Sequence, residues 1–162
     1  MPQNSETSEA SARPFKHVEY RLSGGRRLAT TVRDSLRMAG IRRSETSAEV
    51  LFQRACRAGG VRLAPPRSRL PGSPDLVNFR RRLAVFVHGC FWHAHGRCIR
   101  ATVPKRNRSF WVAKFRRNKE RDLAVATQLR RLGFRVFTVW ECQVKDPRRL
   151  SRRIEALAKL EL

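Results

Sequence analysis

Two cysteines and three histidines lie close together between residues 88 and 98, directly after an apolar segment. Cys90, His95 and Cys98 supply soft or borderline metal ligands within nine residues, and Cys142 follows a second apolar segment. If these apolar segments are neighbouring strands, their ends meet and the four side chains can close a tetrahedral Cys3His site. Four protein ligands without an open position would hold a structural Zn²⁺ that staples an irregular loop.

Spacing alone leaves two alternatives to this zinc site. His93 competes with His95 as the fourth ligand, because it also lies close to Cys90 in the sequence. The other interpretation is a pair of core cysteines with surface histidines, since Cys142 is remote and the short spacing is not that of a standard zinc finger. Cys56 lies among apolar positions of a predicted helix, so we expect it in the core.

Candidate acid–base residues come from separate segments. Asp75 follows Ser-Pro at the start of a predicted strand, where a carboxylate can hold Mg²⁺, although most Pro-Asp pairs are simply turns. Asn118 and Asp122 interrupt an apolar helical stripe. An Asp there can hold one ring nitrogen of a histidine and raise its basicity as a general base. The alternative places both residues at the solvent edge of the stripe.

Two further residues have competing explanations. Thr46-Ser-Ala-Glu49 fits a capping box, so Glu49 has an ordinary role unless it reaches the same site as Asp75. His88 comes directly after a predicted strand and is an additional site candidate, with packing as the alternative.

The charge of the chain favours nucleic acid as a partner. There are 36 Lys and Arg against 13 Asp and Glu, a net charge of +23, which suits a polyanion and nucleic acid before anionic lipid. Basic residues alternate with large aromatic rings, a combination that suits phosphate contacts and stacking. The alternative is core rings beside solvated charges, which we accept for Phe115 and not for Trp92. The residues expected to contact DNA are Phe91, Trp92, Lys105, Arg106, Arg108, Trp111 and Asn118.

The sequence shows no apolar run near the roughly 20 residues of a membrane span and no signal-peptide segment after Met1. We therefore expect a soluble, cytoplasmic and nucleoid-associated protein of bacterial type, without a membrane partner and acting as a monomer. In such a compartment four cysteines favour metal ligands or core positions over disulfides.

Periodicity predicts an α/β domain. Residues 1–30 lack apolar periodicity and are expected to form a basic, disordered arm, and residues 31–162 form the domain, with some helical character over 30–43. The domain elements are a helix from Thr46 to Gly59 that turns Val50, Leu51, Ala55 and Cys56 inward, strands at 76–79 and 83–87, a helix at 109–132, a strand at 134–140 and a last helix capped by Asp146. This order predicts one central mixed sheet flanked by helices, with the strands at 83–87 and 134–140 both central.

Several segments together resemble the very short patch repair (Vsr) DNA mismatch endonucleases. They occur in the family's order across about residues 33 to 145, and Gly-Cys-Phe-Trp-His together with Trp-Glu-Cys is the most specific part. The matching segments are Thr46-Ser-Ala-Glu49, Leu70-Pro-Gly-Ser-Pro-Asp75, Val85-Phe-Val-His-Gly-Cys-Phe-Trp-His93, Pro104 through Trp111, Lys114-x3-Asn118-x2-Arg-Asp122 and Val139-Trp-Glu-Cys142.

The resemblance implies a fold related to the type II restriction endonucleases (the PD-(D/E)xK group). It implies Mg²⁺-dependent nicking of double-stranded DNA next to the thymine of a T:G mismatch, which arises by deamination of 5-methylcytosine, as the first step of very short patch repair. A DNA cytosine methyltransferase would be a functionally linked partner. A restriction or defence nuclease of the same fold without mismatch selectivity is the main alternative, and a zinc-stapled DNA-binding module without activity is the second.

The resemblance also implies residue roles. Asp75 and the backbone carbonyl of Val87 would bind Mg²⁺, and Glu49 would support the water shell of the metal. His93 would be the general base, held by Asp122. The zinc ligands would be Cys90, His95, Cys98 and Cys142, and the residues wedged beside the mismatch, which mark it through DNA deformability, would be Phe91, Trp92 and Trp111.

Overall fold

The computed structural model describes residues 17–21, 27–31 and 46–161. These fall into two units, one ending at Ile41 and the other starting at Arg42. Within the described residues no helix combines the length and the apolar character that a bilayer crossing needs.

The first unit contains an antiparallel strand pair. β1 (His17–Arg21) pairs with β2 (Arg27–Thr31), with His17 opposite Thr31. The segment expected to be a disordered arm thus includes β1 and most of β2, and these residues pair as strands instead of lacking regular structure. The rest of that segment, and the helical character expected up to residue 43, lie outside the described residues, so the boundary between arm and domain stays a prediction.

The second unit is built on a mixed sheet with the strand order β3-β4-β5. β3 (Leu76–Asn78) and β4 (Leu83–His88) form the predicted antiparallel hairpin, and β4 pairs in parallel with β5 (Arg135–Trp140). β4 is the central strand and is buried from Leu83 to Val87, as its continuous apolar sequence predicts. β5 was expected to be central as well, but it lies at an edge of the sheet in the described part of the chain.

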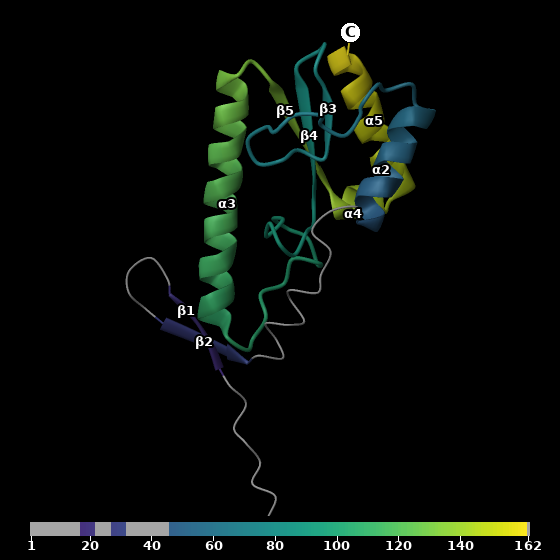
Figure 1. Cartoon of the computed structure of the whole chain (residues 1–162). Coiled ribbons are helices and arrows are strands. Elements are labelled where there is room, and N and C mark those ends of the chain that lie inside the picture. Colours follow the sequence, from purple (N-terminus) through teal and green to yellow (C-terminus); the bar gives the residue numbers. More distant parts are fainter. Residues whose placement is uncertain (1–16, 22–26, 32–45, 162) are drawn as a thin grey trace, which may run out of the picture. The chain divides into compact units, whose positions relative to one another are not determined.

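Helices cover both faces of this sheet (Figure 1). α3 (Arg108–Arg131) lies on one face, and α2 (Ser47–Ala58) and α5 (Pro147–Glu161) lie on the other. Alternate residues of β4 serve the two faces: Val85 belongs to the core with α2 and α5, whereas Phe86 packs with Leu129 of α3. Because side chains alternate along a strand, His88 continues the row of Phe86 toward α3. The predicted mixed sheet flanked by helices is confirmed.

α2 begins and ends as predicted, but it turns a different stripe inward. Thr46 is the N-cap and Gly59 the C-cap. The buried positions are Ala48, Phe52 and Cys56, whereas Val50 and Leu51 are 36% and 44% exposed. The prediction that these side chains face the core was therefore right for Cys56 and wrong for Val50 and Leu51. The large Phe52 ring sets the buried face of the helix instead.

The elements after β4 follow the predicted order, with one addition. α3 begins at Arg108 and its chain reverses at Gly133, which has a φ of +81°. A short helix that periodicity missed, α4 (Glu141–Val144), follows β5 directly. Asp146 caps α5 as predicted, since its Oδ1 accepts from the Arg149 N–H at 3.1 Å.

Candidate active site and metal cluster

The carboxyl ends of β4 and β5 bring the candidate residues together. The two strands are parallel, and His88 at the end of β4 lies opposite Trp140 at the end of β5. Cys90 and Cys142 each follow two residues later. Parallel neighbours end at the same edge of a sheet, so two segments about fifty residues apart meet here. The meeting expected from the sequence is confirmed.

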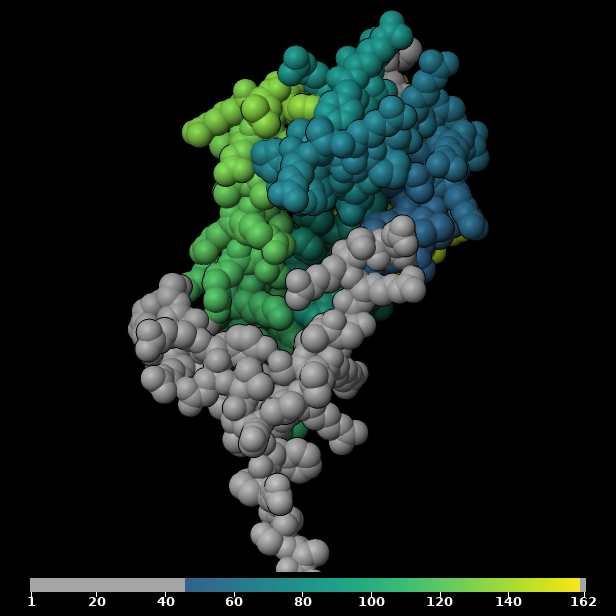
Figure 2. Space-filling model, in the orientation of Figure 1, coloured from purple at the N-terminus to yellow at the C-terminus, as the bar shows by residue number. Residues whose placement is uncertain are grey.

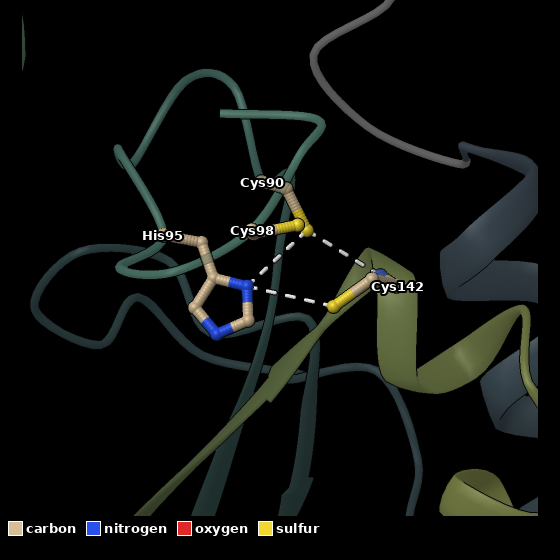
Figure 3. Close-up of side chains that lie close together, drawn as sticks. All are labelled: Cys90, His95, Cys98 and Cys142. Carbon is tan, nitrogen blue, oxygen red and sulfur yellow. Dashed lines mark hydrogen bonds between the residues drawn. The ribbon is translucent and has the colours of Figure 1, made fainter. Parts of the chain in front are cut away.

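Cys90, His95, Cys98 and Cys142 form a compact cluster (Figure 3). Their candidate ligand atoms all lie within 4.8 Å of one another. His95 Nδ1 lies 3.6 Å from Cys90 Sγ and 3.4 Å from Cys142 Sγ. Cys142 also donates its backbone N–H to Cys90 Sγ at 3.4 Å. Of the two competing histidines, His95 is therefore the one that joins the cysteines.

The chemistry of this donor set fits a zinc ion. Three sulfurs and one imidazole nitrogen are the donors of a closed structural zinc site. Burial raises the pKa of the Cys90 thiol to about 12, so this thiol stays protonated at neutral pH unless a cation lies beside it. A coordinated metal ion supplies that positive charge and deprotonates the thiol. The cluster can therefore hold a metal, and zinc suits its ligands best.

His93 does not belong to the cysteine cluster and pairs with α3. Its Nδ1 lies 2.5 Å from Asp122 Oδ2. One turn earlier on α3, the Asn118 side chain donates to the Trp92 carbonyl at 2.7 Å. The two polar positions of the apolar stripe thus hold adjacent residues of the loop, and the Asp122 side chain is only 22% exposed. The structure therefore places both residues toward the loop, not at a solvent edge.

His88 joins this pair as a third member. Its ring stacks on the His93 ring, with centroids 3.8 Å apart and planes 8° from parallel. Burial, together with the neighbouring His93, lowers the pKa of His88 to about 4, so His88 is uncharged at neutral pH. Ligand atoms of His88, His93 and Asp122 lie within 4.8 Å of one another. Of the two explanations for His88, the structure favours a place in the site.

Asp75 is fixed at the start of β3 by backbone groups of β4. Its Oδ2 accepts from the Val87 N–H at 2.7 Å, and its own N–H donates to the Val85 carbonyl at 3.0 Å. Burial raises the pKa of Asp75 to about 6, and the negative charge of Glu49 adds to the effect. A desolvated carboxylate with an acidic neighbour fits a divalent cation. The cation would offset both the loss of solvation and the repulsion between the two negative charges.

Glu49 forms one half of the predicted capping box through its backbone N–H, while its carboxylate accepts from the Thr46 hydroxyl in place of the Thr46 N–H. Its N–H donates to Thr46 Oγ1 at 3.3 Å, and the Thr46 hydroxyl donates to Glu49 Oε1 at 2.8 Å. The negative charge of Glu49 also contributes to the raised pKa of Asp75, which is consistent with a role near that carboxylate. The two explanations of Glu49 are therefore compatible.

Gly72 is a positioning residue that the sequence reasoning missed. It has a φ of +70°, and a Cβ at this position would lie 2.3 Å from Val125 Cγ1. The loop that leads to Asp75 therefore packs closely on α3, one turn after Asp122. The Leu-Pro-Gly-Ser-Pro run signalled a turn, but no sequence pattern indicated its partner on α3.

Large rings from the loop after β4 and from the start of α3 gather in one group. The Phe91 ring centroid lies 5.1 Å from those of both Trp92 and Trp111. Trp111 and Phe115 are buried, and Phe91 and Trp92 are half-buried. The core position expected for Phe115 is confirmed. Trp111 forms the base of this aromatic group, so the more accessible rings are those on the loop.

Lys105, Arg106 and Arg108 lie exposed where α3 begins. The first turn of α3, Arg-Ser-Phe-Trp, has no acidic residue. Cations at a helix N-terminus do not stabilise the helix, whereas N–H groups and basic side chains at that end together attract an anion. Figure 2 shows α3, in green, along one flank of the face in view. These charges therefore suit an external phosphate.

Comparison with known proteins gives related nucleases. The family model described as DNA mismatch endonuclease Vsr matches residues 28–100. The type II nicking enzyme V.NmeAIP of Neisseria meningitidis serogroup A is 37% identical over 130 residues, 80% of this chain and 92% of the relative. The type II nicking enzyme V.XorIIP of Xanthomonas oryzae pv. oryzae is 38% identical over 117 residues, 72% of this chain and 85% of the relative. The DNA mismatch endonuclease Vsr of Escherichia coli K12 is 35% identical over 117 residues, 72% of this chain and 74% of the relative.

Proposed function

Since this chain belongs to the Vsr family and is a DNA endonuclease, we propose that it nicks one strand of duplex DNA next to the thymine of a T:G mismatch. Such mismatches arise by deamination of 5-methylcytosine, and the nick would start very short patch repair. The observation that carries the proposal is the His93 imidazole held by Asp122 at 2.5 Å. An imidazole held in place by a half-buried carboxylate suits the general base of a metal-assisted phosphodiester hydrolysis.

His93 is the general base in this proposal. Asp122 accepts from Nδ1–H, which fixes the tautomer and leaves the lone pair of Nε2 to take a proton from the attacking water. As the water oxygen bonds to phosphorus, its proton passes to Nε2, and the bond from phosphorus to the leaving oxygen breaks. The carboxylate of Asp122 then stabilises the imidazolium. His88, uncharged and stacked on His93, keeps that ring in place.

Asp75 and the backbone carbonyl of Val87 would hold Mg²⁺, with Glu49 orienting its water. The hydrogen bond from the Val87 N–H to Asp75 supports this assignment, because it fixes the carboxylate beside that stretch of β4. When bound, Mg²⁺ neutralises negative charge that develops on the phosphate.

Cys90, His95, Cys98 and Cys142 would hold a structural Zn²⁺. The donor set and the buried Cys90 thiol support this assignment. The segment from Cys90 to Cys98 also carries Phe91, Trp92 and His93. The metal would therefore fix the loop that positions both the rings and the general base.

Phe91 and Trp92, with Trp111 beneath them, would wedge beside the mismatch. A T:G pair deforms more easily than a matched pair, so a wedge selects it through the lower cost of unstacking. Asn118 supports the wedge by holding the Trp92 carbonyl. Phosphate contacts from the start of α3 would come from Lys105, Arg106 and Arg108.

The remaining assignments follow from the family. The mixed sheet with flanking helices is consistent with a fold related to the type II restriction endonucleases. We infer action as a monomer in a bacterial-type cytoplasm, at the nucleoid, with a functional link to a DNA cytosine methyltransferase whose product deaminates to the substrate.

A nicking enzyme without mismatch selectivity is the second candidate. V.NmeAIP and V.XorIIP both carry the name type II nicking enzyme. Such an enzyme would use the same base and metal ligands, so only its substrate preference distinguishes it.

Strand-specific labelling tests the proposal. Two duplexes of the same sequence, one with T:G and one with C:G, are incubated with protein and Mg²⁺, with a different label on each strand. The proposal predicts a single nick beside the thymine of T:G. Equal nicking of both duplexes would establish the second candidate, and DNA binding without any nick would leave a binding module.

A further inference from the structure

A continuous series of ring contacts connects the cysteine cluster with the candidate catalytic pair. The His95 ring stacks on Trp140, with centroids 4.1 Å apart and planes 6° from parallel. The edge contact between Trp140 and His88 has a centroid distance of 5.5 Å and an interplanar angle of 73°. His88 in turn stacks on His93 at 3.8 Å. Trp140 therefore touches one residue of each cluster.

The backbone at Trp140 is fixed from both sides. Before it, β5 is paired with β4, and Trp140 lies opposite His88 in that pairing. After it, α4 begins at once, and the Trp140 N–H donates to Gln143 Oε1 at 3.1 Å. The next residue, Glu141, pairs with Arg100 at 3.8 Å, just beyond Cys98. The backbone that carries the indole is therefore held by hydrogen bonds before and after Trp140.

We propose that Trp140 is a positioning residue that joins the metal cluster to the catalytic imidazoles, so that closing the cluster around zinc sets where His88 and His93 stand. The inference rests on the proposed function and deepens it. Two ligands of the cluster are connected to Trp140, because His95 stacks on the indole and Cys142 follows Trp140 by two residues in the chain. A metal that holds both of them would fix the indole through the stacked ring and through the backbone, and the indole edge contacts His88.

The consequence for catalysis follows from geometry. His93 is held at Nδ1 by Asp122, which fixes one point of the ring, and by the stack with His88, which fixes its plane. Without the indole edge, His88 can tilt and His93 Nε2 loses its direction toward the water. Misplacement of a catalytic group by about 1 Å can cost on the order of 10²-fold in rate.

The test uses three variants of β5. Trp140→Leu removes the flat ring, and Trp140→Phe keeps a smaller one. Phe137→Leu is the matched control, because Phe137 lies on the same strand, three residues earlier and on the opposite face of the sheet, where it packs in the main core. Two quantities are measured on each protein: the rate of zinc release to a coloured chelator, and the single-turnover nicking rate at saturating DNA.

We expect Trp140→Leu to change both quantities. Zinc release should become on the order of ten-fold faster, as for other residues that support a metal ligand, and the nicking rate should fall on the order of 10- to 100-fold. DNA affinity should stay within about two-fold. Trp140→Phe should recover most of both losses, and Phe137→Leu should change neither. If Trp140→Leu does not fold, Trp140→Met, which keeps more volume without a flat ring, takes its place.

Three results would overturn the inference: unchanged zinc release, an unchanged nicking rate, or equal changes in Phe137→Leu. Failure of the proposed function looks different. Zinc release is measured without DNA, so it does not depend on the proposed substrate. Nicking is compared on whichever duplex the wild-type protein cuts, so the comparison of variants stays valid even if the protein does not select T:G.

Discussion

His93 and Asp122 are 29 residues apart in sequence, and their side chains meet at 2.5 Å between Nδ1 and Oδ2. The loop after β4 supplies the imidazole and the middle of α3 supplies the carboxylate. The contact commits one ring nitrogen to a fixed partner, and the other is then the basic atom. An Asp on an apolar helical stripe is thereby explained by the site and not by packing.

Removing either member of this pair should slow strand cleavage. We expect His93→Ala to reduce the single-turnover rate on the order of 10²- to 10⁴-fold, because a general base contributes about that much. Asp122→Asn should also reduce it substantially, since an amide can hold the wrong tautomer. Glu120→Gln on the exposed side of α3 is the control and should keep full activity. A fully active His93→Ala protein would remove the base from this role.

The Asp75 carboxylate should lower the stability of the metal-free protein at neutral pH. Its pKa in the folded state is about 6, above its ordinary value, so the folded protein binds this proton more tightly than the unfolded chain does. The free energy of unfolding therefore falls as pH rises through about 6. Metal-free Asp75→Asn should melt above wild type at pH 7.5, with a smaller difference at pH 5.

Mg²⁺ provides the companion measurement for Asp75. Added Mg²⁺ should raise the melting temperature of wild type, because a ligand that binds the folded state stabilises it, and should leave Asp75→Asn unchanged. The account of this site fails if Asp75→Asn is the less stable protein at pH 7.5 or responds to Mg²⁺ as wild type does.

Gly72 and Gly60 form a matched pair for testing the loop that carries Asp75. Both have positive φ, +70° and +74°, but a Cβ at Gly60 would meet nothing within 4 Å. Gly60→Ala should therefore cost only the backbone penalty of about 1 kcal/mol. Gly72→Ala should cost more and also lower the nicking rate, because the clash with Val125 displaces the loop. A second change, Val125→Ala, should restore part of both losses. Equal melting temperatures for the two Gly→Ala variants would contradict this packing.

Periodicity and capping signals predicted most of the second unit, because its strands and caps are local features. Thr46, Asp146 and the apolar run of β4 were placed correctly from neighbours within a few residues. The contact of Asp122 with a histidine was only one of two alternatives, since no local signal says which way a half-buried carboxylate turns. α4 is a single turn, too short for any periodicity, and it was missed.

The sequence did not show which strands pair, so contacts between strand ends could be predicted only on the assumption that the strands are neighbours. The sequence suggested that Cys142 joins Cys90 if two strands are neighbours, and the parallel register of β4 and β5 meets that condition. Contacts that depend on three-dimensional packing had no such signal. The stack of His95 on Trp140 and the approach of Gly72 to Val125 arise from rings and backbones of distant segments.

Zinc content should depend on Cys142 and not on Cys56. Cys142 belongs to the four-residue cluster, whereas Cys56 is buried in the core between α2 and the sheet. Wild type and Cys56→Ala should both contain about one zinc per chain, and Cys142→Ala should contain less, because the closed site loses one of its four ligands. Elemental analysis of the purified proteins measures this directly. Full zinc in Cys142→Ala would exclude the proposed ligand set.

The basic residues at the start of α3 should appear in the salt dependence of DNA binding. Each phosphate contact that is lost flattens the slope of log K against log salt by about 0.9. Replacing Lys105, Arg106 and Arg108 by Ala should therefore flatten the slope by up to about 2.7. Arg131→Ala at the other end of α3 is the control for a lost charge. An unchanged slope in the triple variant would mean that this end of α3 does not touch DNA.

The rate ratio between a T:G duplex and the matched C:G duplex tests the central claim most directly. Both rates are measured under single-turnover conditions with Mg²⁺, and His93→Ala serves as the blank. We predict rapid nicking of the thymine strand in T:G and a rate near the blank for C:G. Equal rates on the two duplexes, both well above the blank, would contradict mismatch selection and leave a nicking enzyme with another specificity.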